Sequence, residues 1–545
     1  MEDFVSRFSL LGRNIFIEMD NQNLAKAREA SKFLYTFLKN DRLIWIRRLQ
    51  KYNTNHIEFK EVWKSATKNM PAENVKELAI AVEQLYAVNP QYLGFQHSPL
   101  HIVADRGNLS IYKCITQKNG FSNPERVDGF TPFHFAGQKG HVDICKFIVE
   151  NIDNKNPKDK MGNTPLLFAA KNGHFEVCKV IIQNTEDKNS VNNYGRTPLF
   201  QAAFRGHFDI CKLIIRNVED KNPADNEGYT PLHVAVQNGH FEIFKLIIEN
   251  VGNKNPANNI GQTPLYTAAY YGHFDVCQLI IENVENKNPA DNEGFTPLHT
   301  AAHKGHFDVC KLIIDNVEDK NPTNNAGYTP LHQAAQNGHL DICKLIIENV
   351  EDKNPEDNNG VTPLYAAAFN GHFDICKLII ENVEKKNPAS NEDFTPLHIA
   401  AQNGHFQICK LIIENVEDKN PKGNGGSTPL SIAAENGYLE ICKLIIDNVS
   451  DKNPTRNNGN TPLHDAAMEG HLEICKLLIE NVENKNPINN DGLTPLNMAA
   501  SNGHLEICQL IIENSYLKYL MYLNFTGFFL PTFVAWFFTP TMVIQ

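Results

Sequence analysis

Histidine and cysteine are the residues of this 545-residue chain whose types and spacing could do chemistry. Eleven of the twelve cysteines occupy one position of a 33-residue period, and a histidine stands four residues before most of them, as His306 stands before Cys310. On a helix that spacing puts two potential zinc ligands on one face. Equivalent helices of neighbouring copies would lie roughly 8–10 Å apart, too far for a four-ligand zinc site or for a disulfide. We therefore expect no metal site and interpret the thiols as small core residues, because phenylalanine replaces one of them at Phe244.

A second histidine recurs in the unit Thr-Pro-Leu-His and could act as a general base. Seven copies keep it, including His233, His299 and His464, while other copies have leucine, phenylalanine, tyrosine, serine or asparagine there. A catalytic base would not recur in this way, and no nucleophile, phosphate-binding glycine loop or clustered carboxylate pair accompanies it. We predict that this histidine bonds to nearby backbone or to the next copy, and that the protein is no enzyme and needs no cofactor.

These residues belong to a 33-residue unit that repeats without insertion or deletion from Ser98 to Asn514. Its threonine falls at 131, 164, 197, 230, 263, 296, 329, 362, 395, 428, 461 and 494. One period earlier, Ser98-Pro99-Leu100-His101 is a divergent first copy, so the chain contains thirteen copies. A unit of this length cannot bury its apolar face alone and must stack on its neighbours. The sequence therefore predicts an all-α solenoid of thirteen units over residues 93–515.

The copy around Thr296 indicates how the unit folds. Thr296 and Pro297 have the types expected of a helix N-cap and first helical residue, and Gly305 supplies the positive φ that ends this short helix. A second helix follows, whose apolar residues form a broad stripe at helical period: Phe307, Val309, Cys310, Leu312, Ile313 and Ile314. A polar hairpin loop then leads to the next threonine.

The period and the Thr-Pro-Leu-His-x-Ala signature resemble those of the ankyrin repeat. The resemblance implies stacked helix-turn-helix units with hairpin loops, whose concave side binds other proteins. The chain departs from this family after the second helix, where it has Val317 or another residue instead of the usual glycine. Asparagine tolerates the left-handed conformation that a β-branched residue resists. We therefore predict that the left-handed cap has moved back to Asn316.

Function is expected where the copies differ, because packing forces the other positions to agree. The variable positions are the residue before the threonine and those four, seven and eight after it. We predict that a partner protein binds the large or charged side chains there: Phe204, Arg205, Tyr270, Tyr271, His303, Lys304, Phe369, Met468, Tyr229, Phe295, Tyr328 and Phe394. Exposed aromatic residues that packing does not require are typical of partner anchors. The alternative is that individual rings cover the adjoining repeat.

Composition indicates a soluble protein, with 42% hydrophobic residues, 21% charged residues and a net charge of −12. Binding to nucleic acid is not expected, because phosphate neutralisation needs clustered lysine and arginine. The first twenty residues contain Glu2, Asp3, Arg7 and Arg13 and no sustained apolar run, which argues against a secretory signal. We expect the protein in the cytoplasm or the nucleus.

Residues 1–50 resemble an F-box, a domain of three small helices. The residues that carry the resemblance are Leu10-Leu11, Ile15-Phe16, Asp20-Asn21, Leu24, Arg28, Ser31-Lys32 and Trp45-Ile46-Arg47. The usual Leu-Pro opening and the usual tryptophan near Leu34 are missing. The resemblance implies that an apolar surface docks on the adaptor subunit of a cullin-type ubiquitin ligase, and that this surface consists of Leu11, Ile15, Phe16, Leu24 and Leu34. The alternative is a helical cap that shields the first repeat from water.

Two further segments flank the repeats. Residues 51–92 predict a helical linker or cap, with one helix around 59–68 and another after Pro71. Residues 516–545 form a hydrophobic tail without charge after Lys518, and the run is long enough to span a bilayer, which takes roughly 20 apolar residues. Gly527, Pro531 and Pro540 argue against one straight helix. The tail is a membrane anchor, the first span of a truncated channel-like protein, or translated intron.

Overall fold

The computed structural model describes residue 46 and residues 70–88, 98–119 and 123–515, with the backbone alone for 81–88 and 117–119. By their internal contacts these residues fall into two units that divide between Pro264 and Leu265. The first unit begins with α6 (Ala72–Val88). Five helix pairs follow: α7 (Pro99–Arg106) and α8 (Leu109–Asn119), α9 (Pro132–Lys139) and α10 (Val142–Asn151), α11 (Pro165–Asn172) and α12 (Phe175–Asn184), α13 (Pro198–Arg205) and α14 (Phe208–Ile215), α15 (Pro231–Gln237) and α16 (Phe241–Ile248).

The second unit contains eight pairs of the same kind. They are α17 (Pro264–Tyr271) and α18 (Phe274–Ile281), α19 (Pro297–Lys304) and α20 (Phe307–Ile314), α21 (Pro330–Asn337) and α22 (Leu340–Asn349), α23 (Pro363–Asn370) and α24 (Phe373–Asn382), α25 (Pro396–Gln402) and α26 (Phe406–Asn415), α27 (Pro429–Glu435) and α28 (Leu439–Asn448), α29 (Pro462–Glu469) and α30 (Leu472–Asn481), α31 (Pro495–Ser501) and α32 (Leu505–Asn514). A short 3-10 turn, η2 (Asn424–Gly426), precedes α27.

Several predictions fall outside the described residues. They concern the F-box-like surface of Leu11, Ile15, Phe16, Leu24 and Leu34, the helix around 59–68 and the hydrophobic tail 516–545. Within the described part of the chain, no helix combines the length and the apolar character needed to cross a membrane.

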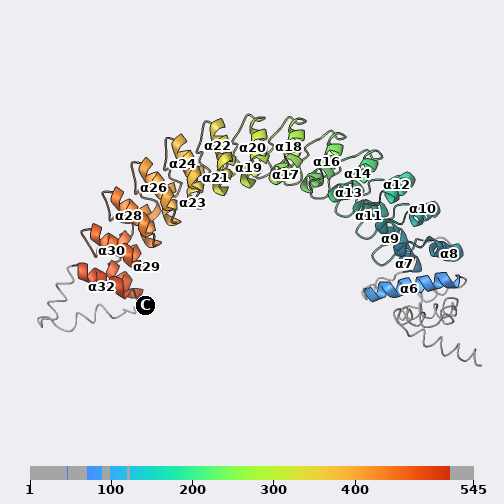
Figure 1. The fold of residues 1–545 in the computed structure, drawn as a ribbon, viewed down its shortest axis with the longest axis horizontal. Helices are drawn as coiled ribbons and strands as arrows, with labels where there is room; N and C mark the ends of the chain where they lie inside the picture. Colours follow the sequence, from blue (N-terminus) through green and yellow to red (C-terminus); the bar gives the residue numbers. More distant parts are fainter. Residues whose placement is uncertain (1–45, 47–69, 89–97, 120–122, 516–545) are drawn as a thin grey trace, which may run out of the picture. The chain divides into compact units, whose positions relative to one another are not determined.

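Within each unit, first helices contact the first helices of neighbouring pairs, and second helices contact second helices in the same way. In the first unit α9 contacts α7 and α11, and α10 contacts α8 and α12. Within each unit the first helices lie along the inner curve and the second helices along the outer curve (Figure 1). Because every pair covers the apolar sides of its neighbours, the predicted all-α solenoid is confirmed.

The first helix begins and ends as its sequence predicts. Thr296 is the extended N-cap residue of α19, with φ −103° and ψ 166°, and Pro297 is the first helical residue. Gly305 follows the helix with φ 81°. Ala301 and Ala302 are completely buried, because their small side chains let neighbouring first helices approach closely.

The second helix supplies most of the remaining core. Val309, Cys310 and Ile313 are at most 1% exposed, which confirms the core role of the cysteine. Phe307 was expected in the same stripe, but its side chain is 39% exposed. It is the first residue of α20, so it lies at the end of the helix.

The prediction of a left-handed asparagine after the second helix is wrong. Among the described residues, Asp393 alone combines a positive φ with a side chain. In α22 the helix ends at Asn349, and Val350 is extended with φ −125° and ψ 153°. The Asn349 Nδ2 donates to the carbonyl oxygen of Leu345 at 2.9 Å, and Asn316 donates to Leu312 in the same way. The side chain thus satisfies a helix-end carbonyl that a left-handed cap would otherwise bond through its backbone.

Within each unit, successive hairpin loops are joined by backbone hydrogen bonds, and in the described part of the second unit the bond is missing between two loops. Asn391 N donates to Asn359 O at 2.9 Å, and Asn457 N donates to Gly425 O at 2.8 Å. In the described loop between these two pairs, the backbone N–H of Asn424 does not donate to the carbonyl oxygen of Glu392. Asp393, with φ 59°, stands there in place of the usual glycine. At Gly360, the equivalent residue one copy earlier, an added Cβ would lie 2.9 Å from the backbone nitrogen of Asn391 in the next loop. A side chain at this position therefore prevents the close approach of the next loop, and Asp393 has such a side chain.

The helix predicted after Pro71 is confirmed as α6, which contacts both helices of the first pair. Val75 and Leu78 are completely buried. On the surface, Asn108 Nδ2 donates to Glu77 Oε2 at 2.6 Å, which ties the start of α8 to α6. This helix therefore covers part of the first helix pair on its N-terminal side.

Candidate functional site

The histidine of the Thr-Pro-Leu-His unit is a structural residue. The backbone N–H of Thr296 donates to His299 Nδ1 at 3.1 Å, so this nitrogen accepts and Nε2 carries the proton. Nε2 donates to the carbonyl oxygen of Tyr328, in the next copy, at 3.0 Å. Both predicted contacts, to nearby backbone and to the next copy, are confirmed.

Burial makes this imidazole difficult to protonate. His299 is completely buried, and desolvation lowers its pKa to about 4. The pKa of the matching side chain in four other copies is also lowered to about 4 by burial; these residues are His134, His233, His332 and His398. Burial lowers the pKa of His464 as well. A group held neutral in this way serves as a hydrogen-bond bridge between copies.

The second recurring histidine, which precedes most of the second helices, also joins neighbouring copies. His339 Nε2 donates to the carbonyl oxygen of His303 at 3.1 Å, and His306 bonds to Tyr270 at the same distance. The His339 ring lies against Gly305 of the preceding copy, where an added Cβ would come within 2.6 Å of the ring. This histidine therefore has a structural role.

The histidine–cysteine pairs do not assemble into larger clusters. Cys310 is completely buried, and desolvation raises the pKa of its thiol. All twelve cysteines are free. Within the described ranges, no group of three or more histidine, cysteine, aspartate or glutamate side chains is arranged to hold a metal ion.

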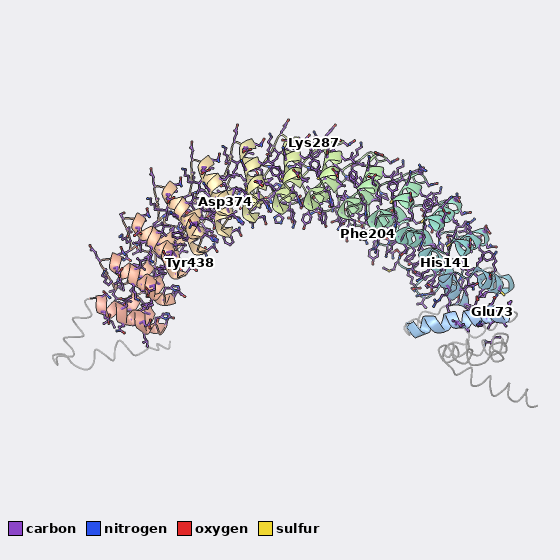
Figure 2. The ribbon with its side chains drawn as sticks, viewed as in Figure 1. Glu73, His141, Phe204, Lys287, Asp374 and Tyr438 are labelled. Carbon is purple, nitrogen blue, oxygen red and sulfur yellow. The ribbon has the colours of Figure 1, made fainter. Side chains whose placement is uncertain are left out.

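Most of the predicted partner-binding residues at the ends of the first helices are exposed. Tyr270, Tyr271 and Phe369 are 39%, 45% and 51% exposed. Arg205, His303 and Lys304 are also exposed, while Phe204 and Met468 are half-buried. Phe204 lies on the inner side of its unit, whereas Lys287, in a loop after a second helix, lies on the outer side of its own (Figure 2). We call the exposed end residues of the first helices the inner face.

The four predicted residues that precede the threonine have a different environment. Tyr229, Phe295, Tyr328 and Phe394 are half-buried, and each ring contacts the buried histidine of its own copy. In the closest of these contacts, the rings of Tyr328 and His332 are stacked with centroids 4.6 Å apart. Covering the imidazole is therefore a structural task of these aromatic residues, which favours the alternative interpretation for them.

One end of the second unit's inner face combines aromatic and cationic groups. Lys304 Nζ lies 4.6 Å from the centre of the Tyr270 ring, and Tyr270 meets Tyr271 edge to face at 5.1 Å. His303 Nδ1 lies 3.0 Å from Gln333 Oε1 in the next copy. Two phenol hydroxyls, an ammonium group and an imidazole thus share one surface, where a carboxylate would find several donors.

The other end of the same inner face is acidic, and part of it was missed from the sequence. Asp465 is buried, and its Oδ2 lies 3.1 Å from Arg456 Nε. The same guanidinium pairs with Glu435 Oε2 at 2.5 Å. Burial raises the pKa of Asp465 to about 7, and the charge of Arg456 opposes that rise. The sequence does distinguish Asp465, because it is the only charged residue at its repeat position in the thirteen copies.

Comparison with known proteins identifies the family of this fold. A family model described as ankyrin repeats (3 copies) matches nine overlapping stretches, which together cover residues 64–520. The chain therefore belongs to the ankyrin repeat family. The matches include no F-box family. Comparison with curated proteins found no match.

Membership of this family defines the class of function. Stacked ankyrin repeats form protein-interaction scaffolds, because packing uses the same positions in every copy and leaves one extended surface free for binding. The chain is a scaffold of this kind that binds other proteins. The inner face is its candidate interaction surface.

Proposed function

We propose that this protein holds a partner protein against the inner face of its repeats and performs no chemistry of its own. The exposed aromatic residues carry the proposal. Helices α17, α21 and α23 each contain eight residues, although α17 ends in Tyr270-Tyr271 and α21 ends in Gln336-Asn337. Because the helix forms equally well with polar ends, folding does not require the tyrosines. Binding to a partner then explains why these large aromatic side chains are exposed to solvent.

Site-specific photo-crosslinking in the full chain tests this proposal. A photoreactive phenylalanine analogue replaces Tyr271 on the inner face, and in a matched control it replaces Leu340, which is 38% exposed at the start of a second helix. We expect a discrete protein adduct from position 271 that disappears with Tyr270→Gln, and no such adduct from position 340. Equal labelling at both positions would contradict the proposal.

We further propose that the protein is the substrate receptor of a cullin-type ubiquitin ligase, with its adaptor bound by residues 1–50. The support is the sequence resemblance of that segment to an F-box. A receptor of this kind raises the effective concentration of the substrate beside the ubiquitin-carrying enzyme. Co-purification with the adaptor, compared between the full chain and the variant Ile15→Ala with Phe16→Ala, tests it. Binding that survives this double substitution rules out the proposed surface.

The corresponding location is the cytoplasm or the nucleus. The sequence of residues 516–545 supports a competing proposal, a scaffold tethered to a membrane, because the run is apolar and free of charge. Extraction of cell membranes with alkaline carbonate separates the two: a receptor without an anchor is released, and a tethered scaffold stays in the pellet. Sequencing the transcript across the codons for Asn514 and Ser515 tests whether the tail is translated intron.

A further inference from the structure

The charges on the inner face of the second unit are not evenly distributed. Resting on the proposed scaffold function, we propose that this face binds one extended segment of the partner in a fixed direction, with an acidic part against Tyr270, Tyr271 and Lys304 and a basic part against Glu435 and Glu469, behind which Asp465 lies buried. The proposal concerns the chemistry of the partner, and the distribution of charge along the face carries it.

The end formed by α17 and α19 fits an acidic group. Lys304 is exposed, and its nitrogen contacts the face of the Tyr270 ring. Among the described residues Lys304 forms no ion pair, so its charge is available to a partner. The exposed hydroxyl groups of Tyr270 and Tyr271 can donate hydrogen bonds to the same carboxylate.

The middle of the face has no formal charge at its most variable positions. Phe369 is 51% exposed and projects from the end of α23. Its counterparts in the flanking copies are Gln336 and Gln402, which are exposed amides. This part of the face fits an apolar side chain of the partner beside Phe369, with amide groups available to bond the backbone of an extended segment.

The end formed by α27 and α29 fits a basic group. Glu435 and Asp465 share one guanidinium, that of Arg456, and Glu469 adds an exposed carboxylate at the end of α29. Asp465 occupies a position where every other copy has an uncharged residue, so packing does not require its charge. A lysine or arginine of the partner would balance the excess of carboxylates over cations at this end.

The separation of the two ends sets the length of the segment. Five repeat steps lead from α19 to α29, and neighbouring helices lie roughly 8–10 Å apart, so the ends are separated by roughly 40–50 Å. An extended chain covers about 3.3 Å per residue and would need about 12–15 residues. We therefore expect acidic and basic groups about a dozen residues apart in the bound segment.

Selection of random peptides of about 20 residues on the immobilised full chain tests this inference. We expect enriched peptides with acidic residues at one end, basic residues at the other and an apolar residue between them. Fluorescence anisotropy of the enriched peptide then measures the effect of Lys304→Glu and of Glu469→Lys. Each reversal should weaken binding about fivefold, and a peptide with its end charges exchanged should recover binding to the double variant.

A charge swap on the outer side of the unit, Lys311→Glu with Glu440→Lys, is the matched control and should leave binding unchanged. Enriched peptides without charge order, or peptides insensitive to both inner reversals, overturn the inference. If such peptides still lose binding with Tyr271→Gln, the proposed inner-face scaffold stands and only the direction is wrong. If no peptide loses binding with Tyr271→Gln, both the fixed direction and the proposed inner-face scaffold are ruled out.

Discussion

His299 donates a hydrogen bond of 3.0 Å from Nε2 to the carbonyl oxygen of Tyr328, so one imidazole connects two consecutive copies of the repeat. A second bond at the same ring requires that Nδ1 be unprotonated, because Nδ1 accepts from the backbone N–H of Thr296. Protonation would place two donors against each other and leave a charge in the core. The joint between copies is therefore sensitive to pH.

Acid should destabilise the repeats through these histidines. The pKa of His299 is about 4 when folded, below the ordinary value of 6.5, so its contribution is complete above pH 6.5 and is lost as the pH falls toward 4. At pH 5 the loss is about 2 kcal/mol for each such histidine. Urea unfolding at pH 7 and pH 5 measures it. His299→Asn should reduce the pH dependence, because Asn497 Oδ1 accepts the equivalent backbone bond at 3.0 Å without titrating. An unchanged pH dependence would contradict this mechanism.

Gly305→Ala should be more destabilising than Gly503→Ala. Both glycines have positive φ, 81° and 79°, so alanine is strained at either position by about 1–2 kcal/mol. Only at Gly305 would the new Cβ also approach the ring of the next copy's histidine, at 2.6 Å, whereas at Gly503 nothing lies within 4 Å. We expect an additional loss of about 1 kcal/mol or more for Gly305→Ala in urea unfolding. Equal losses would show that the ring yields without cost.

Asp393→Gly should stabilise the second unit. Glycine removes the strain of a side chain at φ 59°, and it lets the next hairpin loop approach. We expect a gain of about 1 kcal/mol in the free energy of unfolding and slower hydrogen exchange at the Asn424 amide, which would gain a partner. The reverse change, Gly360→Asp, should be destabilising and should open its own joint. Unchanged exchange at Asn424 would mean that another feature keeps these loops apart.

Asn349→Asp should weaken the end of α22. The Nδ2 of Asn349 donates to Leu345 O, and an aspartate carboxylate cannot donate and would repel that carbonyl. We expect a loss of about 1 kcal/mol in thermal or urea unfolding. Val350→Gly should bring no compensating gain, because the backbone is extended there and does not use the left-handed region. A stabilising Val350→Gly would instead indicate a left-handed cap in solution.

The sequence by itself determined the repeat and the helices. The period, the Thr296-Pro297 start and the Gly305 end depend on interactions within a few residues, and these residue types have few alternative conformations. It did not determine the end of the second helix correctly. At Asn349 two local solutions compete, a left-handed backbone and a side-chain bond to Leu345, and residue type alone does not decide between them.

Only the tertiary structure decided which variable residues are free to bind. Tyr328 and Tyr270 are both aromatic residues at variable positions, but Tyr328 covers the imidazole of His332 while Tyr270 remains 39% exposed. Arg456 and Asp465 meet because a hairpin loop turns back onto the helix that follows it. Exposure and charge pairing depend on neighbouring copies and on chain reversal, and no single unit of the sequence contains that information.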